Sequence, residues 1–160
     1  MVWRLPRAEY EKGKGAGNRA AFHRRVQSGA PPGVVAYARG EPVGWCAVAP
    51  RTEYPYLARS RVLRPVDEQP VWSISCLLVA KPYRQRGLSG RLLCAAVKMA
   101  GKAGAVIVEG YPVIPYASRM ADAFAWTGTL SAFRSAGFEE VGRGSPKRPI
   151  MRAYPARLTR

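Results

Sequence analysis

The feature that most constrains the fold is residues 71–103, VWSISCLLVAKPYRQRGLSGRLLCAAVKMAGKA. Its first part, residues 71–79, is a nearly continuous apolar run that stops at Lys81-Pro82, and such a run predicts a strand that is buried on both faces. From residue 88 onward the apolar residues recur every three or four positions, which predicts an amphipathic helix over 88–102. The segment is therefore a strand, a turn and a helix.

The turn between them, residues 84–90 (RQRGLSG), has the composition of an anion-binding loop. Gly87 and Gly90 carry no Cβ and Ser89 is small, so an anion can approach the backbone closely. The first amides of the following helix have no partner within the helix and lie at the positive end of its dipole, so they can donate to phosphate oxygens. Arg84 and Arg86 add positive charge. We therefore expect a diphosphate to bind here.

Two well-known phosphate loops do not fit this turn. The dinucleotide fingerprint needs a third glycine, and the Walker loop needs Gly-Lys-Ser/Thr, which is absent. The remaining pattern, Arg-x-x-Gly-x-Ser between a strand and a helix, resembles the acyl-CoA-binding motif of the GNAT superfamily of N-acetyltransferases, Q/R-x-x-G-x-G/A. Arg84 and Gly87 match that motif, and Ser89 stands where glycine or alanine is usual.

The order of the other expected elements agrees with this resemblance. Two strands in a hairpin (34–38 and 43–48) precede residues 71–103, and a second buried strand (105–110) follows them. A short helix (129–136) and two closing strands (138–141 and 150–153) come last; we also expect a short strand at 1–6 and an ordered loop at 50–70. The resemblance implies an α/β (α+β) fold: a mixed, mostly antiparallel central sheet with a parallel splayed strand pair, flanked by helices. We expect one domain over residues 1–160.

By the same resemblance the co-substrate is acetyl-CoA. Its pantetheine arm is expected between the splayed strands, bonded to main-chain groups of the central strand, with the donor to the thioester carbonyl near Leu78. Its diphosphate is expected on the turn. The residues that the resemblance places against acetyl-CoA are Leu77, Leu78, Val79, Arg84, Gln85, Arg86, Gly87, Leu88, Ser89, Gly90 and Phe133. No metal is expected.

The implied reaction is direct attack of a primary amine on the thioester in a ternary complex. Glu109 is the candidate base, because it is the only carboxylate in either expected buried strand and burial would raise its pKa. A structural salt bridge with an arginine is the alternative role. Asp122 is a weaker candidate base.

The sequence offers several candidates for the general acid. Many GNAT enzymes have a tyrosine four residues before the Gly-Phe glycine, whereas this chain has Phe133, which cannot donate a proton. Trp126 stands where asparagine is common. The candidate donors are Tyr111, Tyr116 and Ser131, or a water; loss of activity is the remaining possibility.

The chain carries 26 Lys and Arg against 10 Asp and Glu, a formal charge of +16. The basic residues are spread along the chain and no nucleic-acid-binding motif accompanies them, so we favour a solvated basic surface, without excluding nucleic acid. The alternative to an active enzyme is therefore a catalytically weak or inactive GNAT-fold module that binds CoA or nucleic acid through this surface.

The remaining expectations concern compartment and partners. Cys46, Cys76 and Cys94 lie in apolar segments without C-x-x-C spacing, which indicates buried reduced thiols. The first fifteen residues contain no apolar segment of signal-peptide length, and no apolar run is long enough to cross a bilayer, so we expect a cytoplasmic protein. The partners expected are acetyl-CoA and an amine acceptor of unknown identity. A homodimer is possible by resemblance alone.

Overall fold

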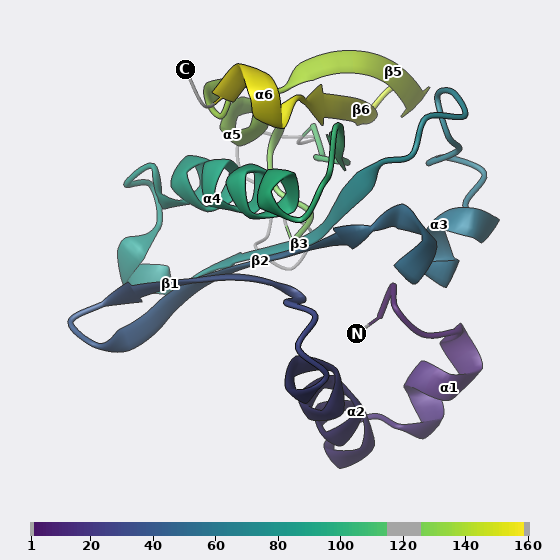
Figure 1. Ribbon diagram of the computed structural model, residues 1–160, viewed down its shortest axis with the longest axis vertical. Helices are drawn as coiled ribbons and strands as arrows, with labels where there is room; N and C mark the ends of the chain where they lie inside the picture. Colours follow the sequence, from purple (N-terminus) through teal and green to yellow (C-terminus); the bar gives the residue numbers. More distant parts are fainter. Residues whose placement is uncertain (1, 115–125, 159–160) are drawn as a thin grey trace.

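The computed structural model describes residues 2–114 and 126–158. Within these residues one six-stranded sheet has the order β1-β2-β3-β4-β6-β5 (Figure 1). Its strands are β1 (Gly33–Ala38), β2 (Glu41–Pro50), β3 (Trp72–Val79), β4 (Val108–Gly110), β5 (Glu139–Ser145) and β6 (Arg148–Ala153). The helices are α1 (Arg7–Lys12), α2 (Ala16–Gln27), η1 (Arg51–Glu53), α3 (Pro55–Arg59), η2 (Lys81–Tyr83), α4 (Leu88–Lys102), α5 (Leu130–Ser135) and α6 (Pro155–Leu158).

The strand pairing confirms the expected mixed, mostly antiparallel sheet. β3 and β4 run parallel, and the other neighbouring pairs are antiparallel. The parallel pair is short, because it extends only from Trp72 opposite Val108 to Ile74 opposite Gly110. β3 continues to Val79 whereas β4 ends at Gly110, so the two strands separate beyond this point. Of the strand expected over 105–110, only the last three residues form β4.

A β-bulge in β3 lies where the strands separate. Cys76 is opposite Ala47 and Ile74 is opposite Val48, so Ser75 is an extra residue on β3. A regular strand would place Ile74 and Leu77 on opposite faces, yet both are buried in the same core cluster. The expectation of burial on both faces fails at Leu78, which is 59% exposed.

The sheet has helices on both faces. α4 and α5 cover one face and α1 and α2 lie on the other (Figure 1). Under α4, Leu92, Leu93 and Val97 pack with apolar residues of β2, β3 and β4. α4 begins and ends where the apolar periodicity predicted. A second cluster, which includes Trp3 and Tyr111, covers the opposite face.

Two expectations for the first half of the chain are wrong. Residues 2–5 form a turn, not a strand, and α1 follows it. The reason is packing, since Trp3 is 5% exposed and its ring stacks on Tyr56 with 5.0 Å between centroids. The expected loop at 50–70 contains η1 and α3, and Pro55 begins α3 where its fixed backbone angle suits the first helical turn.

The described helices include none with the length and apolarity of a membrane span.

Candidate active site

The turn before α4 leaves its backbone open. Gly87 is the N-cap of α4 and has a φ of +72°, the left-handed region that favours glycine. A Cβ placed on Gly87 or on Gly90 would meet no atom within 4 Å. Leu88 anchors the helix start, because its side chain is 8% exposed and packs in the core beneath. The amides at the start of α4 can therefore donate to a diphosphate, so the turn fits the expected co-substrate.

The side chains of the turn differ in their exposure. Arg84 is half-buried, and its Nε donates a 2.9 Å hydrogen bond to the carbonyl oxygen of Val79, the last residue of β3. Gln85 and Arg86 are exposed, and Ser89 is half-buried. Arg84 thus joins the turn to the strand, whereas Arg86 offers a cation at the surface.

The gap beyond the parallel pair contains an amide that points away from β2. The amide of Leu77 donates to the carbonyl oxygen of Trp126 at 2.7 Å, and the amide of Ala80 donates to Val43 on β2. Because amides alternate in direction along a strand, the amide of Leu78 points to β2. The donor that faces the gap is therefore Leu77, one residue before the expected position.

Residues just after the undescribed segment border this gap. The amide of Val113, beyond β4, donates to the carbonyl oxygen of Gly128 at 3.0 Å, while Trp126 accepts from Leu77 on β3. The backbone from Trp126 to Gly128 thus bonds β3 on one side and the residues that follow β4 on the other. A thioester carbonyl and the Trp126 carbonyl would compete for the same amide.

Glu109 is buried between two arginines. Its side chain is 1% exposed, with Oε1 3.9 Å from Arg51 Nη1 and Oε2 3.6 Å from Arg152 Nη2. Oε2 accepts no hydrogen bond from the described residues. Burial raises the pKa of Glu109, and the charges of Arg152 and Arg51 oppose that increase. Both proposed roles of this carboxylate, base and salt-bridge partner, are consistent with this position.

Tyr111 lies in the same polar cluster as Glu109. Its hydroxyl accepts a 2.6 Å hydrogen bond from Arg51 Nη1 and lies 2.8 Å from Ser73 Oγ. Burial and then the charge of Glu109 raise the pKa of Tyr111. Arg51 therefore contacts both sequence-predicted residues, Glu109 and Tyr111.

The remaining candidates lie elsewhere. Ser131 is exposed at the start of α5, with its Oγ 3.1 Å from Thr129 Oγ1. Phe133 is fully buried, and its ring packs so closely that a Cβ on Gly110 would lie 1.9 Å from it. Within the described part of the chain no contact joins Ser131 to Glu109 or Tyr111. Tyr116 and Asp122 lie outside the described residues.

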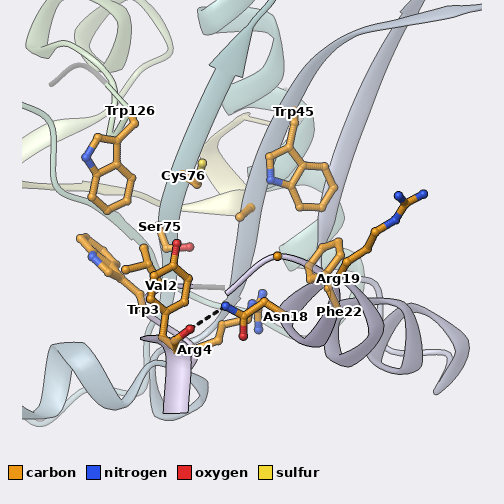
Figure 2. Close-up of a pocket in the computed structure, with 13 residues that line it drawn as sticks. Val2, Trp3, Arg4, Asn18, Arg19, Phe22, Trp45, Ser75, Cys76 and Trp126 are labelled. Atoms are coloured by element: carbon orange, nitrogen blue, oxygen red, sulfur yellow. Dashed lines mark hydrogen bonds between the residues drawn. The ribbon is translucent and has the colours of Figure 1, made fainter. Parts of the chain in front are cut away.

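A cavity of about 510 Å³ lies between β2 and β3 on one side and α1 and α2 on the other. We call it the aromatic cavity after its aromatic lining residues Trp3, Tyr10, Phe22, Trp45 and Trp126. Ser75 and Cys76 of β3 line it directly before Leu77, and Trp126 and Trp45 flank Cys76 in Figure 2. Sequence reasoning missed these aromatic residues, because they are far apart in the chain and share no motif.

A second cavity, the polar cavity, has a volume of about 550 Å³ and lies at the amino ends of β3 and β4. Glu109, Arg51, Arg152 and Asp67 line it. Arg152 donates two hydrogen bonds to Asp67, at 2.6 and 2.9 Å. Glu109 thus faces the polar cavity and is not among the residues lining the aromatic cavity.

Solved structures of low sequence identity share this fold. The ribosomal-protein-alanine N-acetyltransferase from Brucella melitensis is 20% identical, with a TM-score of 0.55 over 86% of this chain and 76% of its own. The yncA protein of Salmonella typhimurium, solved with its cofactor acetyl-CoA, is 15% identical, with a TM-score of 0.55 over 86% and 72%. The PaiA N-acetyltransferase of Thermoplasma acidophilum, solved with coenzyme A, is 13% identical, with a TM-score of 0.54 over 92% and 76%.

The sequence itself matches one family model. No curated protein matches the chain. Residues 1–113, which include the open turn before α4 and the separated strands, match the model of the Acetyltransferase (GNAT) family. The match covers well over half of the chain, so this protein belongs to the GNAT family of acetyltransferases.

Proposed function

We propose that this protein transfers the acetyl group of acetyl-CoA to a primary amine, which attacks the thioester directly. One observation carries the proposal: the amide of Leu77 faces the gap between β3 and β4 and already donates to a carbonyl oxygen there, that of Trp126 at 2.7 Å. A thioester carbonyl in the same place would accept the same hydrogen bond.

The open turn supplies the second part of the binding site. The amides after Gly87 and the cation of Arg86 would hold the diphosphate, and the main chain of residues 77–79 would hold the pantetheine arm. Acetyl-CoA or coenzyme A is present in two of the solved structures that share this fold, which supports the assignment. Open space at Gly87 and Gly90 allows the backbone approach that this binding needs.

Bound acetyl-CoA supplies an activated acetyl group. The amine nitrogen forms a bond to the acetyl carbon, the carbon–sulfur bond breaks, the nitrogen loses a proton and the thiolate gains one. The Leu77 amide would stabilise negative charge that develops on the carbonyl oxygen. Burial raises the pKa of Cys76 beside it, so a Cys76 thiolate is scarce, which favours direct attack over an acyl-enzyme.

Proton transfer is assigned to the candidates from the sequence. Glu109 is the proposed base, supported by its raised pKa and its position on β4 directly before the strands separate. Because Glu109 faces the polar cavity, the proton of an amine bound outside that cavity would reach this carboxylate through an intervening group. Tyr111 and Ser131 remain the proposed donors to the leaving thiolate.

We also propose that residues 1–160 act as one domain. The family match ends at residue 113, but β6 pairs directly with β4 and β5 pairs with β6, so the last strands complete the same sheet.

Two measurements test the proposed function. Acetyl-CoA should raise the melting temperature of the purified protein by mass action, and amines should release free CoA thiol from it. A shift without thiol release from any amine would favour the inactive CoA-binding module. No shift at millimolar acetyl-CoA would contradict both readings. Affinity for nucleic acid that falls steeply with salt, without a shift, would favour the nucleic-acid-binding alternative.

A further inference from the structure

The aromatic cavity lies where an acceptor would have to bind. Its β3 residues, Ser75 and Cys76, directly precede Leu77, whose amide faces the gap. The cavity opens on the face of the sheet that carries α1 and α2, opposite the face covered by α4 (Figure 1). An amine held there would approach the thioester from the side away from α4. The polar cavity lies at the other end of β3, near Val71 and Trp72.

Aromatic rings form two sides of this cavity. Trp3 and Trp126 make an edge-to-face pair with 5.2 Å between centroids, and Phe22 and Trp45 make another at 6.0 Å. These pairs come from segments far apart in the chain and line the same cavity, with Trp126 and Trp45 on either side of Cys76 (Figure 2). Indole and phenyl faces favour a flat apolar or aromatic group between them.

The charged residues of the cavity are arginines. Arg4 donates to Glu53 at 2.6 Å and to the hydroxyl of Tyr54 at 3.0 Å, so its guanidinium is already paired. Arg19 is exposed at the rim. The described residues that line the cavity include no carboxylate. The formal charge of +16 on the whole chain and the two arginines of the cavity disfavour a polycation, and aromatic faces alone cannot offset the repulsion of several ammonium charges.

We propose that the acetyl acceptor is an aromatic monoamine, a single primary amine joined by a short linker to an aromatic ring that binds in the aromatic cavity. This inference rests on the proposed function for its chemistry, while the ring-binding site itself rests on the cavity alone. The ring lies among Trp3, Trp45 and Trp126, and the amine points toward Cys76 and the gap beyond it. An arylalkylamine and an aromatic amino acid share this chemistry, and a carboxylate on the latter would lie near the basic rim.

Binding without acetyl-CoA tests the cavity by itself. Calorimetric titration of the wild-type protein with tryptamine, tryptophan and spermidine should show binding of at least one indole compound and no comparable binding of spermidine. Trp45→Ala should weaken indole binding by about tenfold or more, because it removes one face of the cavity. Tyr37→Ala is the matched control, because Tyr37 is an aromatic residue on the adjacent strand that is 66% exposed and outside the cavity. Trp45→Phe, which keeps an aromatic ring, should restore part of the affinity if the alanine variant folds poorly.

Acetyl transfer then distinguishes the inference from the proposed function. With acetyl-CoA present, kcat/KM should be at least about tenfold higher for the indole amines than for spermidine, and Trp45→Ala should raise KM without removing the acetyl-CoA melting shift. A preference for spermidine, or indole binding that is unaffected by Trp45→Ala, overturns the inference and leaves the proposed function intact. Indole binding in the absence of any acetyl-CoA shift supports the cavity and contradicts the proposed function.

Discussion

The amide of Leu77 donates a 2.7 Å hydrogen bond to the carbonyl oxygen of Trp126, across the gap that opens between β3 and β4. This bond keeps a strand amide satisfied where β4 no longer pairs with β3. Under the proposed function a bound thioester needs the same donor, and we therefore expect cofactor binding to be coupled to the position of Trp126.

This coupling predicts a fluorescence response. Acetyl-CoA should change the tryptophan emission of the wild-type protein, because Trp126 loses its bond to Leu77 and its indole environment changes. Trp126→Phe should abolish most of that change, whereas Trp45→Phe should retain it. An equal response in both variants would mean that the environment of the Trp126 indole does not change when acetyl-CoA binds, which would contradict the predicted coupling.

Substitution of Gly87 should separate cofactor binding from stability. Gly87→Glu places a carboxylate beside the expected diphosphate, so the melting shift with acetyl-CoA should disappear. Gly104→Glu is the matched control, because Gly104 follows the other end of α4, also has a positive φ (+90°) and also has no atom within 4 Å of an added Cβ. Both variants should lose roughly 1–2 kcal/mol of stability from backbone strain. Retention of the shift in Gly87→Glu would place the cofactor elsewhere.

The role of Glu109 can be tested by replacing its carboxylate with the neutral amide of glutamine. Glu109→Gln should leave the acetyl-CoA melting shift intact and lower kcat by about 10²-fold or more. Since a base must be deprotonated, wild-type activity should rise as the pH passes through the raised pKa of Glu109. The activity of the variant should not show this rise. Glu139→Gln, at an exposed carboxylate of β5 that is 3.8 Å from Arg157, should change neither property. Unchanged turnover in Glu109→Gln would leave Glu109 only a structural role.

The Asp67–Arg152 pair predicts a pH dependence of stability. The hydrogen bonds that Arg152 donates to Asp67 lower the pKa of Asp67 from 3.8 to about 2. A carboxyl whose pKa is lower in the folded state stabilises the protein above its unfolded pKa, and this contribution disappears as the pH falls from about 4 to about 2. The effect should be modest, because the Asp67 side chain is 41% exposed.

Urea unfolding across this pH range measures the effect. Relative to wild type, Asp67→Asn should be less stable at neutral pH, and the difference should shrink toward pH 2. Glu109 titrates with the opposite sign, because burial raises its pKa, so the comparison is made between variants and not on the wild-type curve alone. Glu68→Gln, in the same loop, should follow the wild type. A difference that stays constant with pH would mean that Asp67 acts through packing.

Local patterns predicted the parts of the fold that local forces determine. α4 covers residues 88–102 as predicted, because an apolar stripe and the left-handed Gly87 both define it. The expected strand at 105–110 was too long, because Ala105 and Ile107 are buried by packing while the neighbouring strand pairs only with Val108–Gly110. The strand expected at 1–6 was wrong because stacking on Trp3 determines that segment.

The candidate site also has a part that the local sequence predicted and a part that it did not. The turn at 84–90 was visible from a contiguous motif and fits the family that the sequence match shows. The aromatic cavity was not visible, because Trp3, Phe22 and Trp126 approach one another only after the sheet and its helices have formed. The sequence also could not predict that the amide of Leu77, and not that of Leu78, faces the gap between β3 and β4, because this depends on how the strands pair.

Ser75 shows how much one inserted residue can determine. With it, β3 buries Ile74 and Leu77 under the same helix face while the Leu77 amide stays turned away from β2. Without Ser75, side chains and amides would alternate regularly along β3. Either the side chain of Leu77 would then leave the core, or its N–H would bond to β2. The number of residues in β3 before Leu77 therefore matters for the proposed reaction: a strand shortened by one residue would lose either a core side chain or the donor to the thioester carbonyl, even with every residue from Cys76 onward unchanged.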